Sequence, residues 1–346
     1  MYLSKLQLKN LRCFSDKELE FSAQTTLIEG CNGSGKTTII EALYYLCYLR
    51  SFRTNITQEL IRFESDSFFV KAYLSDSFAS KETLQVGFSP AKRLVKLNDL
   101  QVSSFKELIN NYRVVVLTED DLNIIKGGPE LRRAFIDQHI YLQDPDWQVE
   151  MHQYKKALDQ RNALLKNHVL DLEQYQIWTN QLITRSETIR AERFIALSQI
   201  EQAINDQLTI NFNAEFTIKL VYQAKNWQSN LQLKEQIMQR TLFGAHLDDY
   251  TIELCDKSSR KFASRGQQKL IAILMKIVQV TLLKKSFLGA ILFLLDDFIT
   301  DLDHAKTTIL LKILGDLGVQ LVFTAPNLPQ IHKDLLIKQG AKVVLV

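Results

Sequence analysis

Net charge, paired cysteines and long apolar runs are all scarce in this 346-residue chain. Lys and Arg number 42 against 39 Asp and Glu, so the formal net charge is only +3. A charge this small cannot by itself draw the chain to nucleic acid, and any such contact must come from a local basic face.

The cysteines and the apolar runs argue against a disulfide-stabilised protein and against a membrane-spanning one. The four cysteines, Cys13, Cys31, Cys47 and Cys255, form no CxxC pair and suggest no disulfide framework, so a reducing cytoplasm is expected. The apolar run Phe287–Leu295 is nine residues long, too short to cross a bilayer, and the first residues lack the layout of a signal peptide.

The hydrophobic content, 46%, is enough for a large core. Continuous apolar strands between helices predict an α/β fold with a parallel core sheet, an antiparallel sheet and a helical second lobe. Strands are expected over Tyr2–Leu8, Lys17–Phe21, Thr25–Glu29, Tyr112–Leu117, Ala290–Leu295, Val319–Thr324 and Lys342–Val346, with a small antiparallel sheet within Phe68–Val102. Helices are expected over Thr37–Leu49, Trp147–Lys166, Asp171–Leu208, Gly266–Lys285 and Leu310–Leu317.

Composition predicts the division of the chain into lobes. Between Pro145 and about Arg240 there is no Gly or Pro, which favours long helices. We therefore expect lobe I at 1–117 and 286–346 and a mostly helical lobe II at 118–285. The apolar pattern does not hold a heptad for long, so a long coiled-coil arm is not expected.

One motif carries strong chemistry, the segment Gly30–Thr37. It reads Gly-Cys-Asn-Gly-Ser-Gly-Lys-Thr and fits the phosphate-binding pattern G-x-x-x-x-G-K-[ST] between a strand and a helix. Glycines allow successive N–H groups to point at one phosphate, and the helix N-terminus favours an anion. The nucleotide-binding residues expected here are Gly30, Cys31, Asn32, Gly33, Ser34, Gly35, Lys36, Thr37 and Thr38, with Lys36 reaching the β- and γ-phosphates and the Thr37 hydroxyl binding Mg²⁺.

A phosphate loop of this kind needs a carboxylate for the metal ion. Ala290–Leu295 predicts a central strand, and Asp296 and Asp297 follow at its carboxyl end, where open α/β sheets bind ligands. We expect Asp296 to bind Mg²⁺ and Asp297 to orient or activate the attacking water.

A third segment precedes the acidic strand. Ser264 and Gly266 stand at the start of a predicted helix, in the sequence Ser-Arg-Gly-Gln. Alone this predicts only an N-cap. Its place 32 residues before Asp296 favours a second phosphate-binding end.

The order of these segments along the chain is that of ABC-type ATPases. The phosphate loop comes first, then Ser-Arg-Gly-Gln as the signature, the acidic strand end, Thr300–Asp303 and a strand ending in Thr324. The chain resembles the RecF family of these ATPases over nearly its whole length. The matching segments are Leu8–Phe14, the phosphate loop with Glu41-Ala42, Arg50–Thr54, Glu119-Asp120, Lys126–Arg133 and Ser264–Lys269. Asp297 stands where most ABC-type relatives carry Glu.

The resemblance implies a site shared by two subunits. Ser264, Gly266 and Gln267 of one chain would meet the γ-phosphate held by Lys36 of the other. Arg12 would lie near the nucleotide, Thr324 would sense the γ-phosphate, and Asp301 with Asp303 would cross the dimer interface. It further implies binding of single-stranded, duplex and gapped DNA, slow DNA-stimulated ATP hydrolysis, partnership with RecO and RecR, loading of RecA at gaps and SOS induction.

One departure from the family's pattern weakens the transfer of an individual role. The family's usual Gly-Pro-His-Arg-Asp-Asp reads here Gly-Ala-His-Leu-Asp-Asp at Gly244–Asp249, so the role of that arginine has no carrier at Leu247. His246 is expected to be a local hydrogen-bonding group.

Several basic residues could contact DNA phosphate, or could form ion pairs within the chain. The first candidates are Arg50, Arg53, Arg132 and Arg133. The long helices add Lys155, Lys156, Arg161, Lys166, Arg185, Arg190 and Arg193. Both interpretations remain open from the sequence.

Three alternative functions are compatible with a phosphate loop. A nucleotide-gated scaffold for mediator proteins would bind ATP with little turnover. A transporter ATPase subunit is disfavoured by the Leu8–Arg12 motif and the large helical insertion. A chromosome-structure ATPase with long arms is disfavoured by the short middle segment.

Overall fold

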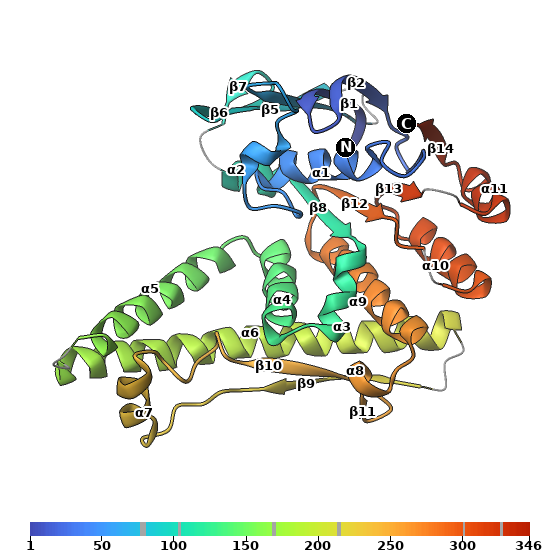
Figure 1. Cartoon of the computed structure of the whole chain (residues 1–346). Coiled ribbons are helices and arrows are strands. Elements are labelled where there is room, and N and C mark those ends of the chain that lie inside the picture. Colours follow the sequence, from blue (N-terminus) through green and yellow to red (C-terminus); the bar gives the residue numbers. More distant parts are fainter. Residues whose placement is uncertain (77–80, 103–104, 168–170, 213–215, 300–301, 326–327) are drawn as a thin grey trace. The chain divides into compact units, whose positions relative to one another are not determined.

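The computed structural model describes residues 1–76, 81–102, 105–167, 171–212, 216–299, 302–325 and 328–346 (Figure 1). The chain forms two compact units. Unit 1 comprises Met1–Asp121 and Val280–Val346, and unit 2 comprises Leu122–Gln279. These boundaries lie within a few residues of the lobes expected from composition.

Unit 1 contains two sheets. The parallel sheet has five strands in the order β14-β3-β13-β12-β8. Its strands are β3 (Thr25–Glu29), β8 (Tyr112–Leu117), β12 (Ala290–Asp296), β13 (Gln320–Ala325) and β14 (Lys342–Leu345). Every residue of β8 and β13 is buried, as expected for strands covered on both faces.

The second sheet of unit 1 is antiparallel, with the order β2-β1-β4-β5-β6-β7. Its strands are β1 (Tyr2–Leu11), β2 (Phe14–Glu20), β4 (Phe68–Ser75), β5 (Lys81–Ser89), β6 (Lys92–Leu97) and β7 (Leu100–Gln101). In β4 buried and half-buried residues alternate, so one face of this sheet is turned to the core.

Helix α1 (Lys36–Tyr48) contacts strands of both sheets, which explains why it is buried on nearly every side. A second link between the sheets is the Gln320 amide. It accepts from the Leu3 N–H and donates to the Leu3 and Ser22 carbonyls, each at 2.7 Å. The remaining helices of the unit are α2 (Phe105–Asn111), α10 (His304–Asp316) and α11 (Gln330–Lys338), with a short 3₁₀ turn at Thr57–Leu60 and another, Glu119–Leu122, at the unit boundary.

Unit 2 is largely helical. It holds α3 (Asn123–Lys126), α4 (Pro129–Gln143), α5 (Trp147–Leu165), α6 (Leu172–Phe212), α7 (Leu231–Met238), α8 (Ser259–Phe262) and the first part of α9 (Arg265–Ser286). No helix among the described residues is long and apolar enough to cross a membrane.

Unit 2 also contains a three-stranded antiparallel sheet that the sequence analysis did not predict. The strands β9 (Ile218–Gln223), β10 (Asp249–Leu254) and β11 (Lys257–Ser258) run in the order β11-β10-β9. The segment around β9 contains no Gly or Pro, and this absence favoured a helical prediction there. The β10–β11 turn likewise uses no glycine, because Cys255 and Asp256 themselves adopt φ of 49° and 58°.

Candidate nucleotide site

The phosphate loop connects the end of β3 to the start of α1. Gly33 and Gly35 adopt φ of 84° and 99°, values that side chains rarely tolerate, so glycine is needed at both positions. A Cβ on Gly30 would come within 2.2 Å of the Val346 carbonyl oxygen. The loop conformation therefore depends on three of its glycines, while Cys31 and Asn32 are exposed.

Lys36 is the first residue of α1 and is 5% exposed. Its Nζ donates to the carbonyls of Gly30 at 2.9 Å and Cys31 at 3.0 Å. The ammonium group is thus folded back over its own loop, where it can bind an anion cradled by the loop N–H groups.

Three strand and helix ends converge beside Lys36. The parallel register pairs Asp296, the last residue of β12, with Thr324 of β13. Asp296 Oδ1 accepts hydrogen bonds from Thr37 Oγ1 at 3.2 Å and from Thr324 Oγ1 at 2.6 Å. Residues separated by more than 250 positions in the sequence are therefore joined at the carboxyl edge of the sheet.

Asp297 follows β12 with a φ of 47°, a strained backbone conformation for a non-glycine residue. Its N–H donates to Thr324 Oγ1 at 3.2 Å. Partial burial, and then the adjacent Asp296 charge, raise the pKa of the Asp297 carboxyl. Strain and a raised pKa at one carboxylate are typical of a functional position.

Arg12 lies in the two-residue turn between β1 and β2. It forms a two-point ion pair with Glu41 of α1, with Nε and Nη2 at 3.1 and 2.9 Å from the two carboxylate oxygens. A Cβ on Gly35 would lie 2.7 Å from Cys13 Sγ and 2.5 Å from the Phe14 ring. The turn that carries Arg12 therefore packs directly on the phosphate loop.

The structure thus gathers Lys36, Thr37, Asp296, Asp297 and Thr324, with Arg12 on the adjoining turn. Thr38, which was also expected to bind the nucleotide, is buried within α1.

The signature residues Ser264, Gly266 and Gln267 belong to unit 2. Ser264 caps α9: its Oγ accepts from the Gln267 N–H at 3.2 Å, and the Gln267 side-chain oxygen accepts from the Ser264 N–H at 2.8 Å. This is a capping box. A Cβ on Gly266 would meet no atom within 4 Å, so this helix start has open space beside it.

Asp301 lies outside the described residues. Asp303 is described, and it caps α10 by accepting the Lys306 N–H at 2.8 Å.

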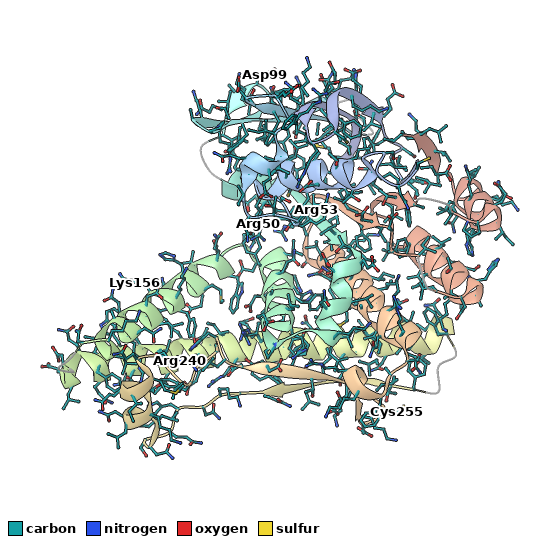
Figure 2. The ribbon with its side chains drawn as sticks, in the orientation of Figure 1. Arg50, Arg53, Asp99, Lys156, Arg240 and Cys255 are labelled. Atoms are coloured by element: carbon teal, nitrogen blue, oxygen red, sulfur yellow. The ribbon has the colours of Figure 1, made fainter. Side chains whose placement is uncertain are left out.

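Five of the arginines in unit 2 form ion pairs within the unit. Arg161 and Arg193 are 0% and 2% exposed. The interpretation of these two residues as DNA contacts is therefore wrong, and the ion-pair interpretation holds for them. The pairs are Arg161–Glu235, Arg193–Asp137, Arg132–Asp249, Arg190–Asp248 and Arg185–Glu150. Arg133 donates to the Asp248 carbonyl at 2.8 Å. In contrast Arg50, Arg53, Lys155, Lys156 and Lys166 are exposed; Figure 2 labels Arg50, Arg53 and Lys156.

The altered Gly244–Asp249 segment supplies the acidic partner of two of these pairs, Asp248 for Arg190 and Asp249 for Arg132. Asp248 is fully buried and accepts from Arg190, Tyr222 and the Lys225 N–H. His246 Nδ1 lies 2.7 Å from the Tyr154 hydroxyl, a local hydrogen bond as expected. The structural role of Asp248 was not predicted from the sequence.

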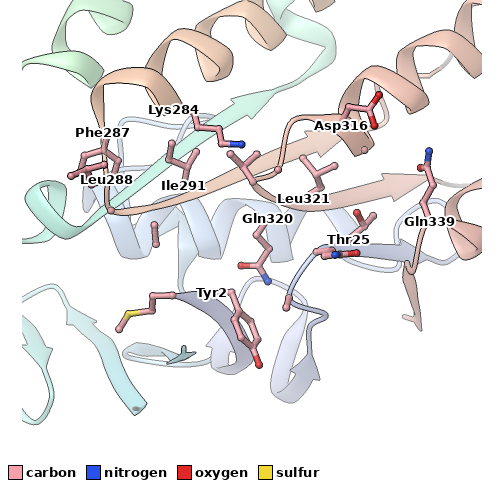
Figure 3. Close-up of a pocket in the computed structure, with 18 residues that line it drawn as sticks. Tyr2, Thr25, Lys284, Phe287, Leu288, Ile291, Asp316, Gln320, Leu321 and Gln339 are labelled. Carbon is pink, nitrogen blue, oxygen red and sulfur yellow. The ribbon is translucent and has the colours of Figure 1, made fainter. Parts of the chain in front are cut away.

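A cavity of unit 1 lies away from this site. It measures about 880 Å³ and is lined by Tyr2, Lys284 and the first residues of β3, β12 and β13 (Figure 3). These residues are at the amino edge of the parallel sheet, whereas the phosphate loop follows its carboxyl edge. No phosphate-loop residue lines this cavity, so it is not the nucleotide site.

These features define the class of protein as an ABC-type P-loop ATPase head. The sequence profile of the RecF/RecN/SMC N-terminal domain matches residues 2–334, and the chain belongs to this family, within its RecF branch.

Named relatives and solved structures agree with this assignment. The chain is 31% identical to the DNA replication and repair protein RecF of Exiguobacterium sp. over 99% of this chain and 96% of the relative. For that of Clostridioides difficile the identity is 29%, over 99% and 96%. A solved structure described as the recombination mediator protein RecF-ATP in the RecFOR pathway superposes with a TM-score of 0.82 at 25% identity, covering 94% of this chain and 92% of that one. The Smc head domain of Pyrococcus furiosus shares the fold, with a TM-score of 0.59 at 16% identity over 100% and 93%.

Proposed function

We propose that this chain binds ATP with Mg²⁺ in unit 1 and uses the nucleotide to control pairing of two copies on DNA during recombinational repair. The observation that carries the proposal is the convergence of Thr37, Asp296 and Thr324 beside the phosphate-loop lysine. The proteins it resembles are named for DNA replication and repair, and one was solved with ATP.

The oxygen atoms at this edge fit a magnesium ion. Octahedral Mg²⁺ with ligands at 2.0–2.1 Å separates neighbouring oxygens by about 2.9 Å. The Thr37 hydroxyl and Asp296 Oδ1 lie 3.2 Å apart, close to that edge. The described residues contain no group of three His, Cys, Asp or Glu side chains that could hold a metal, so phosphate oxygens and water would complete the shell.

Hydrolysis would rely on Asp297 and Thr324. The raised pKa of the Asp297 carboxyl makes it a stronger base toward an attacking water than an exposed aspartate. The Thr324 hydroxyl donates to Asp296 and accepts from the Asp297 N–H, so one side chain links both acids. A γ-phosphate that recruits the Thr324 hydroxyl would therefore disturb its bonds to the Asp296 carboxylate and the Asp297 N–H.

The second half of the site would come from another copy of the chain. Ser264, Gly266 and Gln267 form a capped helix start with open space beside it. Such an end binds anions through its N–H groups. The γ-phosphate held by Lys36 in one copy would meet this end in the other, with Asp301 and Asp303 at the interface.

DNA contact would be independent of sequence and sensitive to salt. Its candidates are the exposed Arg50, Arg53, Lys155, Lys156 and Lys166. Single-stranded, duplex and gapped DNA are the proposed ligands, and RecO and RecR the proposed mediator partners in RecA loading and SOS induction. A solved relative is described as a mediator in the RecFOR pathway, which supports this assignment.

The test is ATP hydrolysis measured with no DNA, single strand, duplex and gapped duplex, for wild type and Lys36→Arg. We expect slow turnover that DNA stimulates and that Lys36→Arg abolishes. The alternative, a nucleotide-gated scaffold, predicts that Asp297→Asn still supports partner loading without turnover. DNA-stimulated turnover that persists in Lys36→Arg contradicts the assigned site.

A further inference from the structure

Glu41 is a buried carboxylate in the phosphate-loop helix, five positions after Lys36. It is 1% exposed, although charged groups are costly to remove from water without partners. The roles proposed above for Lys36, Thr37, Asp296, Asp297 and Thr324 make no use of it. Its partners therefore show what its burial achieves.

Arg12 is the first partner. The two-point ion pair occupies Nε and one N–H of Nη2, and fixes the plane of the guanidinium. Among the described residues Nη1 makes no hydrogen bond, so this edge of the guanidinium keeps its donors for an incoming anion. Arg12 itself is held in place because its backbone N–H donates to the Leu60 carbonyl at 2.8 Å.

The second partner is the Ser51 hydroxyl, which donates to Glu41 Oε1. Ser51 Oγ also accepts the backbone N–H groups of Arg53 at 2.9 Å and Thr54 at 3.2 Å. The turn 51–54 is therefore organised around this hydroxyl, and it presents the exposed Arg53 (Figure 2).

Together these contacts form one chain of direct interactions. It runs from Gly35 of the phosphate loop to Cys13 and Phe14, then through Arg12, Glu41 and Ser51 to the Arg53 backbone. Glu41 is the one member that touches both Arg12 and Ser51.

We propose that Glu41 is a positioning residue that couples nucleotide binding at the phosphate loop to the conformation of the turn bearing Arg53. It holds Arg12 for the nucleotide on one side and anchors Ser51 on the other. This proposal rests on the proposed function of the same site.

The experiment measures ATP affinity by titration with a fluorescent ATP analogue, and ATP-dependent amide exchange at residues 51–54. Glu41→Gln removes the charge, and we expect its affinity to fall about tenfold, the order of 1.4 kcal/mol. The double variant R12A/E41Q should bind no more weakly than R12A, because the two act through one ion pair. In the wild type ATP should change exchange at Arg53 and Thr54, and Ser51→Ala should remove that ATP dependence.

The matched control is Glu59→Gln, which removes an exposed carboxylate from the same region that bonds Thr54 and not Arg12. It should bind ATP as the wild type does. If E41Q fails to fold, Arg12→Lys, which keeps the charge and loses the two-point geometry, tests the same link and should lower ATP affinity.

Wild-type ATP affinity in E41Q or R12K, additive losses in the double variant, or exchange at 51–54 that ignores ATP would each overturn the coupling. A wild type that binds no ATP would instead overturn the proposed function. The two failures are therefore distinguishable.

Discussion

Two Arg–Glu pairs with a buried glutamate, one in each unit, differ in how many of the arginine N–H donors are used. In unit 2 all five N–H donors of Arg161 are used: by Thr179, Tyr175, Thr241 and both oxygens of Glu235. In unit 1, among the described residues, Arg12 side-chain bonds run only to Glu41 and use two donors. Arg161 is fully buried, whereas the Arg12 side chain is 26% exposed.

The Arg161–Glu235 pair can therefore have only a structural role, whereas the Arg12–Glu41 pair can still bind an anion. A closed network, in which every arginine donor is used, leaves none for a ligand. Its contribution is seen in the stability that is lost when one partner is removed. An arginine with donors to spare, packed on a phosphate loop, can add an anion without losing its carboxylate.

Arg161→Met should lower the free energy of unfolding of unit 2 by about 3–5 kcal/mol, because it leaves Glu235 charged and buried without its partner. Urea unfolding followed by circular dichroism measures it. The double replacement R161M/E235L removes both charges and should recover much of the loss. A single variant within about 1 kcal/mol of wild type would show that the closed network is not structural.

Asp297→Asn should slow ATP hydrolysis by about 10²–10⁴-fold, the usual contribution of a positioned base, while ATP still binds. Single-turnover phosphate release measures the chemical step. Asp334→Asn, an exposed carboxylate on α11, is the matched control and should hydrolyse at the wild-type rate. Unchanged turnover in D297N would remove Asp297 from the chemistry.

Acid should weaken unit 2 through the buried His139. Burial lowers the pKa of His139 to about 4, while the unfolded side chain titrates near 6.5, so between these values the unfolded state binds the extra proton. Stability is then present above the unfolded pKa and is lost as pH falls, by about 2 kcal/mol between pH 7 and pH 5. His139→Gln should reduce this loss; an identical pH dependence in both proteins would contradict it.

Ser264 tests whether the signature is only a helix cap. Ser264→Ala should cost about 1 kcal/mol of stability, as a lost cap does, and Ser264→Asp should keep the cap. If Ser264 also faces a phosphate, Asp at this position should abolish ATP-driven pairing despite a preserved thermal midpoint. Pairing that survives in S264D would leave Ser264 as a cap alone.

Much of the site could be predicted from local sequence, because its chemistry is concentrated at strand ends. The run of apolar residues before Asp296 fixes a central strand, and the loop pattern places Lys36 and Thr37 at the start of a helix. The register that joins Asp296 to Thr324 follows once both strands are parallel and adjacent.

The parts that were missed depend on contacts distant in sequence. No local pattern shows that Arg161 reaches Glu235, 74 positions later, or that Arg190 reaches Asp248. An arginine in a helical segment reads equally as a DNA contact or an ion pair. The β9–β10 sheet was missed because its strand β9 lies in a stretch without turn-forming glycine or proline, and alternation over six residues is a weak signal beside long helices.

Unit 1 is proposed to hold half of an ATP site that a second copy completes. Sedimentation velocity of Asp297→Asn with no nucleotide, with ADP, and with ATP and Mg²⁺ tests this pairing, with Ser264→Arg/Asp297→Asn as the control. We predict a monomer without nucleotide and with ADP, a dimer with ATP, and no dimer in the double variant. One unchanged monomer under all conditions, with and without DNA, would contradict it.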